Sequence, residues 1–404
     1  MIPYHEALSI VLACANPLGS KIIKLEQAIG SVLAKDISTK YNIPFFDNSA
    51  VDGYGVRVSD VKNASNEYPV KLQLIGTIKA GDEPKVVITP GTTVKILTGA
   101  SIPDGVEAVI MREFCYEEKK YVYLKKSASK WENIRREGEE FHINERVIEK
   151  GTYINPPVIG LLATLGYKKC WVHLKPRVRV IVTGNELIKP GEKLAPGKIY
   201  ESNSYALVAA LKEIGIKKYS VVCVKDDKKI IKNQIKKALK SSDIIISVGG
   251  ISVGDYDFVK EVFNSVGVKT LFTEVAIKPA KPNYFGSFKK KLVFGLPGNP
   301  VSALVSFHQL IRPALLKIMG AKSTAPFQAK AALTENLNKK PGRLEFVRGI
   351  LEQKNGDLLV QPTKGQGSHM LGGIVKANCL IHFPLEKKSM LKGETADLEF
   401  LQWN

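Results

Sequence analysis

Residues 176–320 alternate between strand-like and helix-like segments, and this alternation constrains the fold of the chain more strongly than any other feature. Residues 178–182 form a nearly continuous β-branched run, which is typical of a strand buried on both faces. Strands that alternate with helices form a parallel sheet covered on both sides. We therefore expect a doubly wound α/β domain over residues 175–322. Its further strands are predicted at 219–224, 243–248 and 291–294, and its helices at 204–214, 228–240, 258–266 and 301–319.

Three polar loops follow strands of this predicted sheet, at residues 183–186, 249–257 and 295–300. In open α/β sheets, ligands bind where the carboxyl ends of the strands meet. Glycine lets the backbone approach a ligand closely, and carboxylates beside it can hold a hard cation. The three loops together predict a ligand site at one edge of the sheet.

The rest of the chain predicts three further domains, so the fold class is multidomain, α/β plus β. Apolar residues at 4–15, at 25–33 and at 154–166 have helical spacing. Short strand-like segments between prolines and glycines occupy two other regions. The expected domains are a helical elongated domain (1–45 and 142–174), a β-rich inserted domain (46–141) and a C-terminal β-barrel-like domain (323–404).

Composition excludes several classes of protein. The chain has 404 residues and a formal charge of +20, but its lysines are spread along its length and its aromatic residues are not interleaved with basic runs. We therefore expect no nucleic-acid partner. Five distant cysteines without a C-x-x-C pair indicate free thiols in a reducing compartment. No uncharged apolar run approaches the roughly 20 residues that span a bilayer, so we expect a cytoplasmic protein without a membrane partner.

The motif Gly-x-Ser-x-Gly at residues 250–254 admits two interpretations. It matches the nucleophile elbow of hydrolases and follows a strand. However, a further glycine precedes it, Asp255 and Asp257 follow it, and no oxyanion segment of the H-G-G-G type is present. His308 lies in an apolar helix and is interpreted as a core residue. A phosphate held by Gly249, Gly250 and their neighbours, with Mg²⁺ at the aspartates, fits this loop better.

Other polar residues point to the same edge of the sheet. Glu186 and Asp226 each follow a predicted strand, although either carboxylate could simply be a surface turn residue. Lys278 and Lys281 lie on a proline-stiffened segment, which lowers the entropy lost when both ammonium groups face one oxyanion. A solvated basic turn is the alternative. Asn299, together with Ser302, can donate hydrogen bonds to the same anion.

A second glycine-rich, acidic loop occupies residues 47–54, in the predicted insert. It contains Asp52, and Thr98 ends a strand of the same domain. Glu140 belongs to a further acidic patch at 135–140. These groups could meet the first site directly or from a second subunit, if the insert reaches across a dimer.

These segments occur in an order that resembles a known family. The motifs lie at 47–54, 97–103, 138–140, 183–187, 249–257, 277–282, 295–302 and 367–370. Together they resemble the molybdopterin molybdenumtransferases, the molybdate-insertion enzymes of molybdenum cofactor biosynthesis, to which the terminal domain of gephyrin is related. The resemblance covers nearly the whole chain.

The resemblance implies four domains, a homodimer and a cleft that both protomers share. It implies insertion of molybdenum from molybdate into adenylylated molybdopterin, with release of AMP and a requirement for Mg²⁺. An upstream adenylyltransferase and recipient molybdoenzymes would be partners. The implied catalytic residues are Asp52, Thr98, Glu140, Glu186, Asp226 and Asp257, with Glu186 and Asp257 as metal ligands. The implied substrate-binding residues are Gly249, Gly250, Ser252, Lys278, Lys281, Asn299, Ser302 and Ser368.

Three positions depart from the family pattern: Val51 replaces methionine, Asn185 replaces aspartate and Ala280 replaces glycine. Asn185 puts the number of metal ligands in question. The lysines and the carboxylates are expected in separate niches, since unneutralised carboxylates would repel molybdate. Two alternatives stay open: a molybdopterin adenylyltransferase, and a non-catalytic scaffold that binds a receptor tail as gephyrin does.

Overall fold

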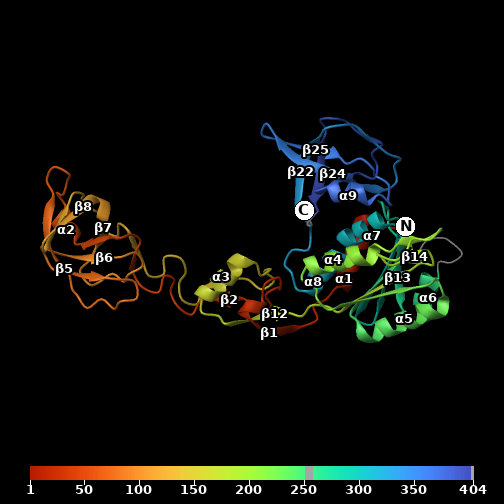
Figure 1. Ribbon diagram of the computed structural model, residues 1–404, viewed down its shortest axis with the longest axis horizontal. Coiled ribbons are helices and arrows are strands. Elements are labelled where there is room, and N and C mark those ends of the chain that lie inside the picture. The colour runs from red at the N-terminus through yellow and green to blue at the C-terminus, as the bar shows by residue number, and fades with distance from the viewer. Residues whose placement is uncertain (251–257, 402–404) are drawn as a thin grey trace. The chain divides into compact units, whose positions relative to one another are not determined.

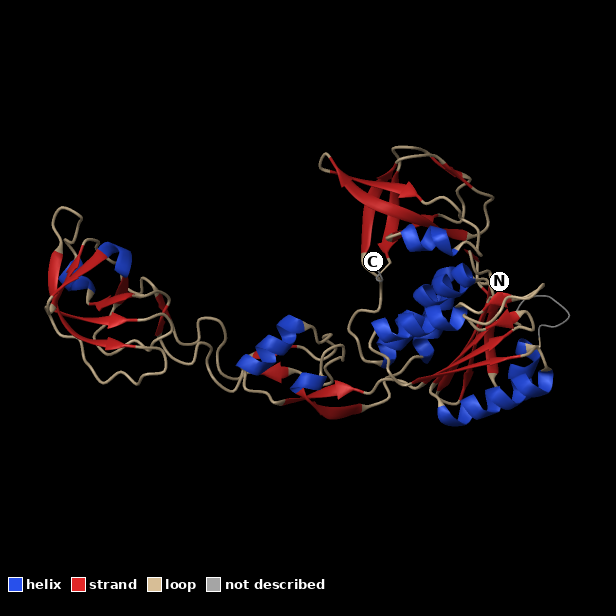
Figure 2. Cartoon of the chain, in the orientation of Figure 1, coloured by secondary structure: helices blue, strands red, loops and turns tan. Residues whose placement is uncertain are grey.

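The computed structural model describes residues 1–250 and 258–401. Ser252, Asp255 and Asp257 of the predicted site lie outside the described residues. The chain divides into two compact units, which are treated separately below (Figures 1 and 2). The larger unit comprises Met1–Lys35, Lys150–Gly160 and Tyr167–Asn404, and the smaller comprises Asp36–Glu149 and Leu161–Gly166.

A six-stranded sheet forms the centre of the larger unit. Its strand order is β16-β13-β17-β21-β20-β18. The first four strands are parallel, as predicted. Strand β20 runs antiparallel to both of its neighbours, β21 and β18, and neither β20 nor β18 was predicted. The doubly wound domain is therefore confirmed, with a mixed rather than a fully parallel sheet. The strands are β13 (Val178–Thr183), β16 (Tyr219–Val224), β17 (Ile244–Val248), β18 (Lys269–Glu274), β20 (Pro282–Phe288) and β21 (Lys291–Leu296).

Helices cover both faces of this sheet (Figure 1). Val180 and Val182 of β13 point into the core beneath α1, α4, α7 and α8, whereas Ile181 points into the core beneath α5 and α6. This alternation explains why β13 is β-branched on both faces. His308 is buried in a π-helical turn between α7 and α8, which confirms it as a core residue. The helices are α1 (Tyr4–Cys14), α4 (Asn203–Glu213), α5 (Lys228–Ser241), α6 (Val259–Ser265), α7 (Pro300–Ser306) and α8 (Arg312–Ile318).

The helical interpretation of residues 25–33 is wrong. Only the short 3-10 turn Leu25–Gln27 is helical there, and the preceding β1 (Ser20–Lys24) pairs with β12 (Lys169–His173). Val32 and Leu33 make isolated bridges, so their burial comes from extended pairing rather than from one face of a helix. Helix α1 packs in the core of the α/β domain. The predicted helix at 154–166 is present as α3 (Pro156–Thr164).

The C-terminal region is a closed five-stranded barrel, as the predicted β-barrel-like domain requires. Strands β24, β25, β22, β28 and β26 follow one another around it, and β26 pairs back to β24. The short β19 (Ile277–Lys278) adds to β24 from the α/β domain. The barrel elements are β22 (Gln328–Leu333), β24 (Leu344–Lys354), β25 (Asp357–Pro362), α9 (Leu371–Lys376), β26 (Cys379–Phe383) and β28 (Thr395–Phe400).

The smaller unit is β-rich, as expected for the insert. Its sheet has the strand order β7-β4-β6-β5-β9-β8 around an apolar core that includes Tyr54, Leu72 and Val122. The boundaries predicted for the four domains stay predictions. No described helix is long and apolar enough to cross a membrane. The strands are β4 (Gly53–Val56), β5 (Val70–Ile78), β6 (Thr92–Ile96), β7 (Ala108–Met111), β8 (Cys115–Glu118) and β9 (Tyr121–Leu124).

Candidate functional site

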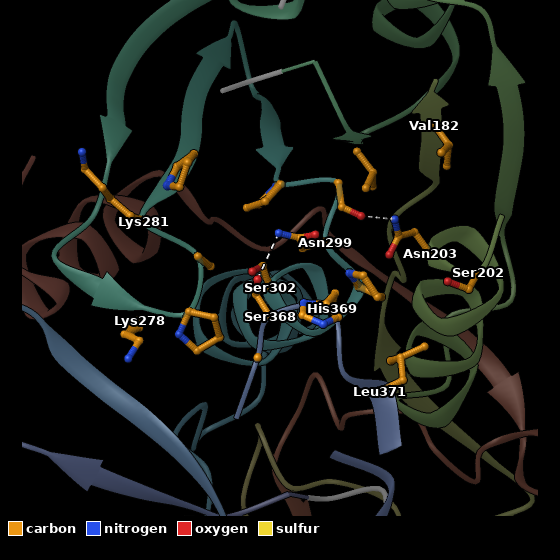
Figure 3. Close-up of a pocket in the computed structure, with 18 of the residues that line it drawn as sticks. Val182, Ser202, Asn203, Lys278, Lys281, Asn299, Ser302, Ser368, His369 and Leu371 are labelled. Atoms are coloured by element: carbon orange, nitrogen blue, oxygen red, sulfur yellow. Dashed lines mark hydrogen bonds between the residues drawn. The ribbon is translucent and has the colours of Figure 1, made fainter. Parts of the chain in front are cut away.

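A cavity of about 1100 Å³ lies at the carboxyl edge of the α/β sheet, within the larger unit (Figure 3). All three predicted loops contribute to its wall, together with residues of the barrel. The geometry therefore brings together most of the residues predicted for this edge. Those that line the cavity are Glu186, Gly250, Lys278, Lys281, Asn299, Ser302 and Ser368.

The glycine turn after β17 needs glycine at two successive positions. Gly249 has φ +88°, and a Cβ there would lie 2.6 Å from the carbonyl oxygen of Thr183. Gly250 has φ +64°, and its Cβ would lie 2.8 Å from a methyl group of Val259. The left-handed backbone and the lack of space each exclude a side chain. The chain can therefore turn sharply where it enters the cavity.

The loop after β13 carries Glu186, which forms the acidic side of the cavity. The backbone N–H of Asn185 donates to the Asp226 carboxylate over 3.0 Å, and the N–H of Asp226 donates to the Asn185 side-chain oxygen over 3.2 Å. These reciprocal bonds fix the residue that precedes Glu186. Glu186 itself lines the cavity, whereas Asp226 is not among the lining residues and instead supports the loop.

The cationic side carries its own carboxylates, which the sequence interpretation did not anticipate. The Lys278 ammonium lies 2.9 Å from a carboxylate oxygen of Glu345 on β24, and that of Lys281 lies 3.3 Å from Glu274. Each lysine therefore pairs with a carboxylate that was not among the predicted site residues, and the expected separation of the lysines from Glu186 and Asp257 stays a prediction. Ala280 between the lysines has φ +76°, which explains why glycine suits this position better.

Neutral donors lie between the two sides. The Asn299 amide donates to the hydroxyl of Ser368 over 3.0 Å (Figure 3). The backbone N–H of Val301 donates to the Ser368 carbonyl. Ser302 is almost fully buried in the first turn of α7 and lines the cavity. These contacts join the loop after β21 to the barrel segment that carries Ser368.

The barrel supplies residues that the sequence interpretation missed, chiefly Arg343, Glu345 and Arg348. Arg348 is fully buried, and its guanidinium donates to the carbonyls of Gly365 and Gly367 over 3.0 and 3.4 Å. Burial lowers the pKa of Arg348. Arg348 could have been found from sequence, because it lies within a predicted strand of the barrel and charged residues are rarely buried without a specific role.

The predicted residues of the insert form a separate group in the smaller unit. The Asp52 carboxylate accepts hydrogen bonds from the backbone N–H and the hydroxyl of Thr98 over 2.8 and 2.7 Å. These bonds hold the pKa of Asp52 below its usual value. Glu140 is exposed, and its N–H donates to the carbonyl of Ile43. Asp52 and Thr98 are therefore joined by hydrogen bonds. Their catalytic role stays a prediction.

Magnesium was expected at Glu186 and Asp257. Among the described residues, no three histidines, cysteines or carboxylates cluster as a metal site. Negative charge is nevertheless concentrated near Glu186: burial, followed by the charges of Glu201 and Glu186, raises the pKa of Cys223. Mg²⁺ commonly binds through one or two protein carboxylates and the phosphates of a substrate. The donor chemistry at Glu186 fits this mode of binding.

A cavity with lysines, hydroxyl donors, a glycine turn and a carboxylate at a sheet edge defines an α/β protein that binds anionic ligands. Comparison with known families is more specific. Residues 2–166 match the MoeA N-terminal region (domain I and II), 179–317 match a probable molybdopterin binding domain, and 330–401 match the MoeA C-terminal region (domain IV). The chain belongs to the MoeA family.

Relatives match almost end to end. The molybdopterin molybdenumtransferase of Haemophilus influenzae is 36% identical over 388 residues, which cover 95% of this chain and 94% of that protein. That of Staphylococcus epidermidis is 35% identical over 403 residues, covering 100% and 96%. The crystal structure of the molybdopterin biosynthesis moeA protein from Pyrococcus horikoshii has a TM-score of 0.85 and 32% identity, covering 99% and 100%. The resemblance to the molybdenumtransferase family is thereby confirmed.

Proposed function

We propose that this chain is a transferase that inserts molybdenum from molybdate into adenylylated molybdopterin, forming molybdenum cofactor and releasing AMP. The observation that carries the proposal is the nearly full-length similarity to proteins named molybdopterin molybdenumtransferase. The cavity adds physical support, because cationic, neutral and acidic groups share its wall. The adenylyltransferase alternative is not favoured, since the matches extend across the insert and the barrel as well as the α/β domain.

The cationic side would bind the oxyanion. Lys278 and Lys281 are each about half exposed, so both ammonium groups can reach a ligand in the cavity. The hydroxyls of Ser302 and Ser368 supply neutral hydrogen bonds, and Asn299 orients Ser368. Such a site works by positioning and electrostatic stabilisation, and no protein nucleophile is required.

The acidic side would hold Mg²⁺, through Glu186 and the Asp257 predicted from sequence. The bound cation would offset negative charge on the phosphate that leaves with AMP. The turn at Gly249 and Gly250 lets backbone N–H groups approach that phosphate closely. Asp226 supports the loop that presents Glu186.

We further propose a cytoplasmic homodimer in which Asp52, Thr98 and Glu140 of one protomer complete the site of the other. Paired hydrogen bonds from Thr98 keep Asp52 ionised, as a role near a cation would need. The experiment mixes an Asp52→Ala protomer with a Glu186→Ala protomer. Activity restored in the mixture supports a shared site. A mixture as inactive as either variant alone contradicts it.

The test of the enzymatic function is release of AMP from adenylylated molybdopterin, with and without molybdate. We expect molybdate-dependent release, and we expect Glu186→Ala to lower it by on the order of 100-fold or more. Glu192→Ala is the control, because this exposed carboxylate lies in a nearby loop and does not line the cavity.

Three results would contradict the proposal or one of its parts. Full activity of Glu186→Ala would remove the metal role of this carboxylate. Consumption of ATP with metal-free pterin and without molybdate would favour the adenylyltransferase instead. Tight binding of a peptide without any turnover would favour the scaffold.

A further inference from the structure

A second cavity in the larger unit has no part in the proposed reaction. It has a volume of about 620 Å³, within the range of small-molecule sites. Its wall comes from the end of α4, from α8, from residues 151–153 and from the segment 321–327 that leads into β22 (helices labelled in Figure 1). It shares no lining residue with the cavity at the sheet edge.

Arg312 is the unusual residue of this wall. Arg312 is only 8% exposed, and its Nη1 atom has no hydrogen-bond partner in the structure. Burial, opposed by the charges of Glu213 and Glu399, lowers the pKa of this guanidinium. A buried, unpartnered donor of a charged group is costly, and such groups in native proteins usually meet a ligand, an ion or water.

The rest of the wall has a cationic and an apolar part. Lys322 and Glu213 are the other charged lining residues, so two cations face one carboxylate. Leu316, Pro326 and Phe327 supply apolar surface. Phe327 is 75% exposed, and its ring lies edge-on to that of Phe400 at 6.1 Å between centroids.

We propose that this cavity binds a small organic acid, with its carboxylate on the Arg312 guanidinium and an apolar or aromatic body against Leu316 and Phe327. A planar guanidinium matches a carboxylate through paired hydrogen bonds. The apolar wall favours an organic acid over inorganic phosphate, which would leave that surface exposed to water.

The occupant would touch the chain where it passes from the α/β domain to the barrel. Residues 321–327 connect α8 to β22, and the barrel in turn supplies Glu345, Arg348 and Ser368 to the first cavity. The second cavity is therefore a binding site on the connection between two parts of the proposed active site.

Binding can be tested on the full chain with benzoate as the acid and benzamide as its neutral analogue of the same shape. Saturation-transfer NMR or calorimetry should show saturable binding of benzoate and binding of benzamide at least about tenfold weaker, the size expected for a hydrogen bond to a charged group. Arg312→Met should weaken benzoate about tenfold or more and abolish the preference over benzamide. Arg312→Lys should retain part of that preference.

Two further variants keep the test decisive. Phe327→Ala alters an exposed side chain, should preserve the fold, and should weaken benzoate several-fold; it serves if Arg312→Met does not fold. Lys281→Met removes a cation of the first cavity and should leave benzoate binding unchanged. Equal binding of benzoate and benzamide, loss on Lys281→Met alone, or no saturable binding up to about 10 mM would each overturn the proposal and leave water as the partner of Arg312.

Discussion

The acidic and cationic sides of the large cavity are held in place by different means. Glu186 follows a loop that is fixed by reciprocal bonds between Asn185 and Asp226, all within the α/β domain. Lys278 and Lys281 are instead held by ion pairs of partly exposed side chains, one of them reaching Glu345 of the barrel. One side is therefore set by the main chain, and the other by contacts between side chains.

This difference matters for binding. Partly exposed ion pairs contribute only about 0–1 kcal/mol, because water screens them and two long side chains lose freedom. The lysines can therefore exchange a carboxylate for an incoming oxyanion at little cost. The main chain before Glu186 is held by the two bonds between Asn185 and Asp226, whereas the Glu186 side chain itself is exposed.

The largest expected effect comes from removal of both cations. The double variant Lys278→Met with Lys281→Met should raise the molybdate concentration needed for half-maximal AMP release about 100-fold, since each lost charged hydrogen bond costs roughly tenfold. The requirement for Mg²⁺ should stay unchanged. A molybdate titration measures the first quantity, and a Mg²⁺ titration measures the second. Lys290→Met, at an exposed lysine outside this cavity, is the control. An unchanged molybdate requirement would contradict the assignment of the cationic side.

The next effect concerns the stability of the barrel, through one buried carboxylate. Glu399 on β28 is buried, with His382 Nε2 at 3.2 Å and His308 Nε2 at 3.5 Å from its carboxylate, and Gln309 donates to it. Burial would raise the pKa of Glu399, but the two neighbouring histidines outweigh it and bring the pKa to about 2.

Because this pKa lies below that of an unfolded glutamate, the stabilisation is present above about pH 4.5 and is lost as pH falls toward 2. We expect Glu399→Gln to lower the free energy of unfolding at neutral pH by on the order of 3 kcal/mol and to flatten its decline in acid. Thermal unfolding at several pH values measures this. Glu394→Gln, at an exposed barrel carboxylate, should change little. An equally steep acid decline in Glu399→Gln would contradict the argument.

A smaller effect is expected when a lysine loses its counter-charge. Glu345→Gln should free Lys278 and lower the half-saturating molybdate concentration about two- to fivefold at low salt, because Glu345 is buried but the Lys278 side chain is about half exposed and water screens the pair. The effect should shrink as salt is added. Glu352→Gln, exposed on the same strand, is the matched control. Weaker molybdate binding would instead show that Glu345 helps to position Lys278.

The smallest effect should come from Asn185→Asp, which restores the carboxylate common in the family. Asn185 uses its backbone N–H and its side-chain oxygen, and an aspartate can make the same two bonds. The Mg²⁺ requirement should therefore change by no more than about twofold, the extra charge acting through solvent. A metal titration of AMP release is the measurement. A tenfold tighter requirement would show that residue 185 is itself a ligand.

The sequence predicts much of this structure, but not all of it. The four parallel strands of the α/β domain were recognisable because β-branched runs and turn residues are local signals, whereas β18 and β20 were not predicted. The prediction of a helix over residues 25–33 was wrong, since Val32 and Leu33 are buried by pairing with distant segments. The glycine turn, Glu186 and the two lysines were found from residue type and position. Glu345 and Arg348 were not, because only the tertiary fold brings the barrel against the sheet edge.

The two lysines of the cavity belong to different sheets. Lys278 ends β19, which is paired with β24 in the barrel, whereas Lys281 directly precedes β20 of the α/β sheet. A rotation of the barrel would carry the first ammonium group away while the second stayed behind. An oxyanion that bridges the two lysines would resist that rotation. Binding of the oxyanion and restriction of the barrel's movement against the α/β domain would therefore be coupled.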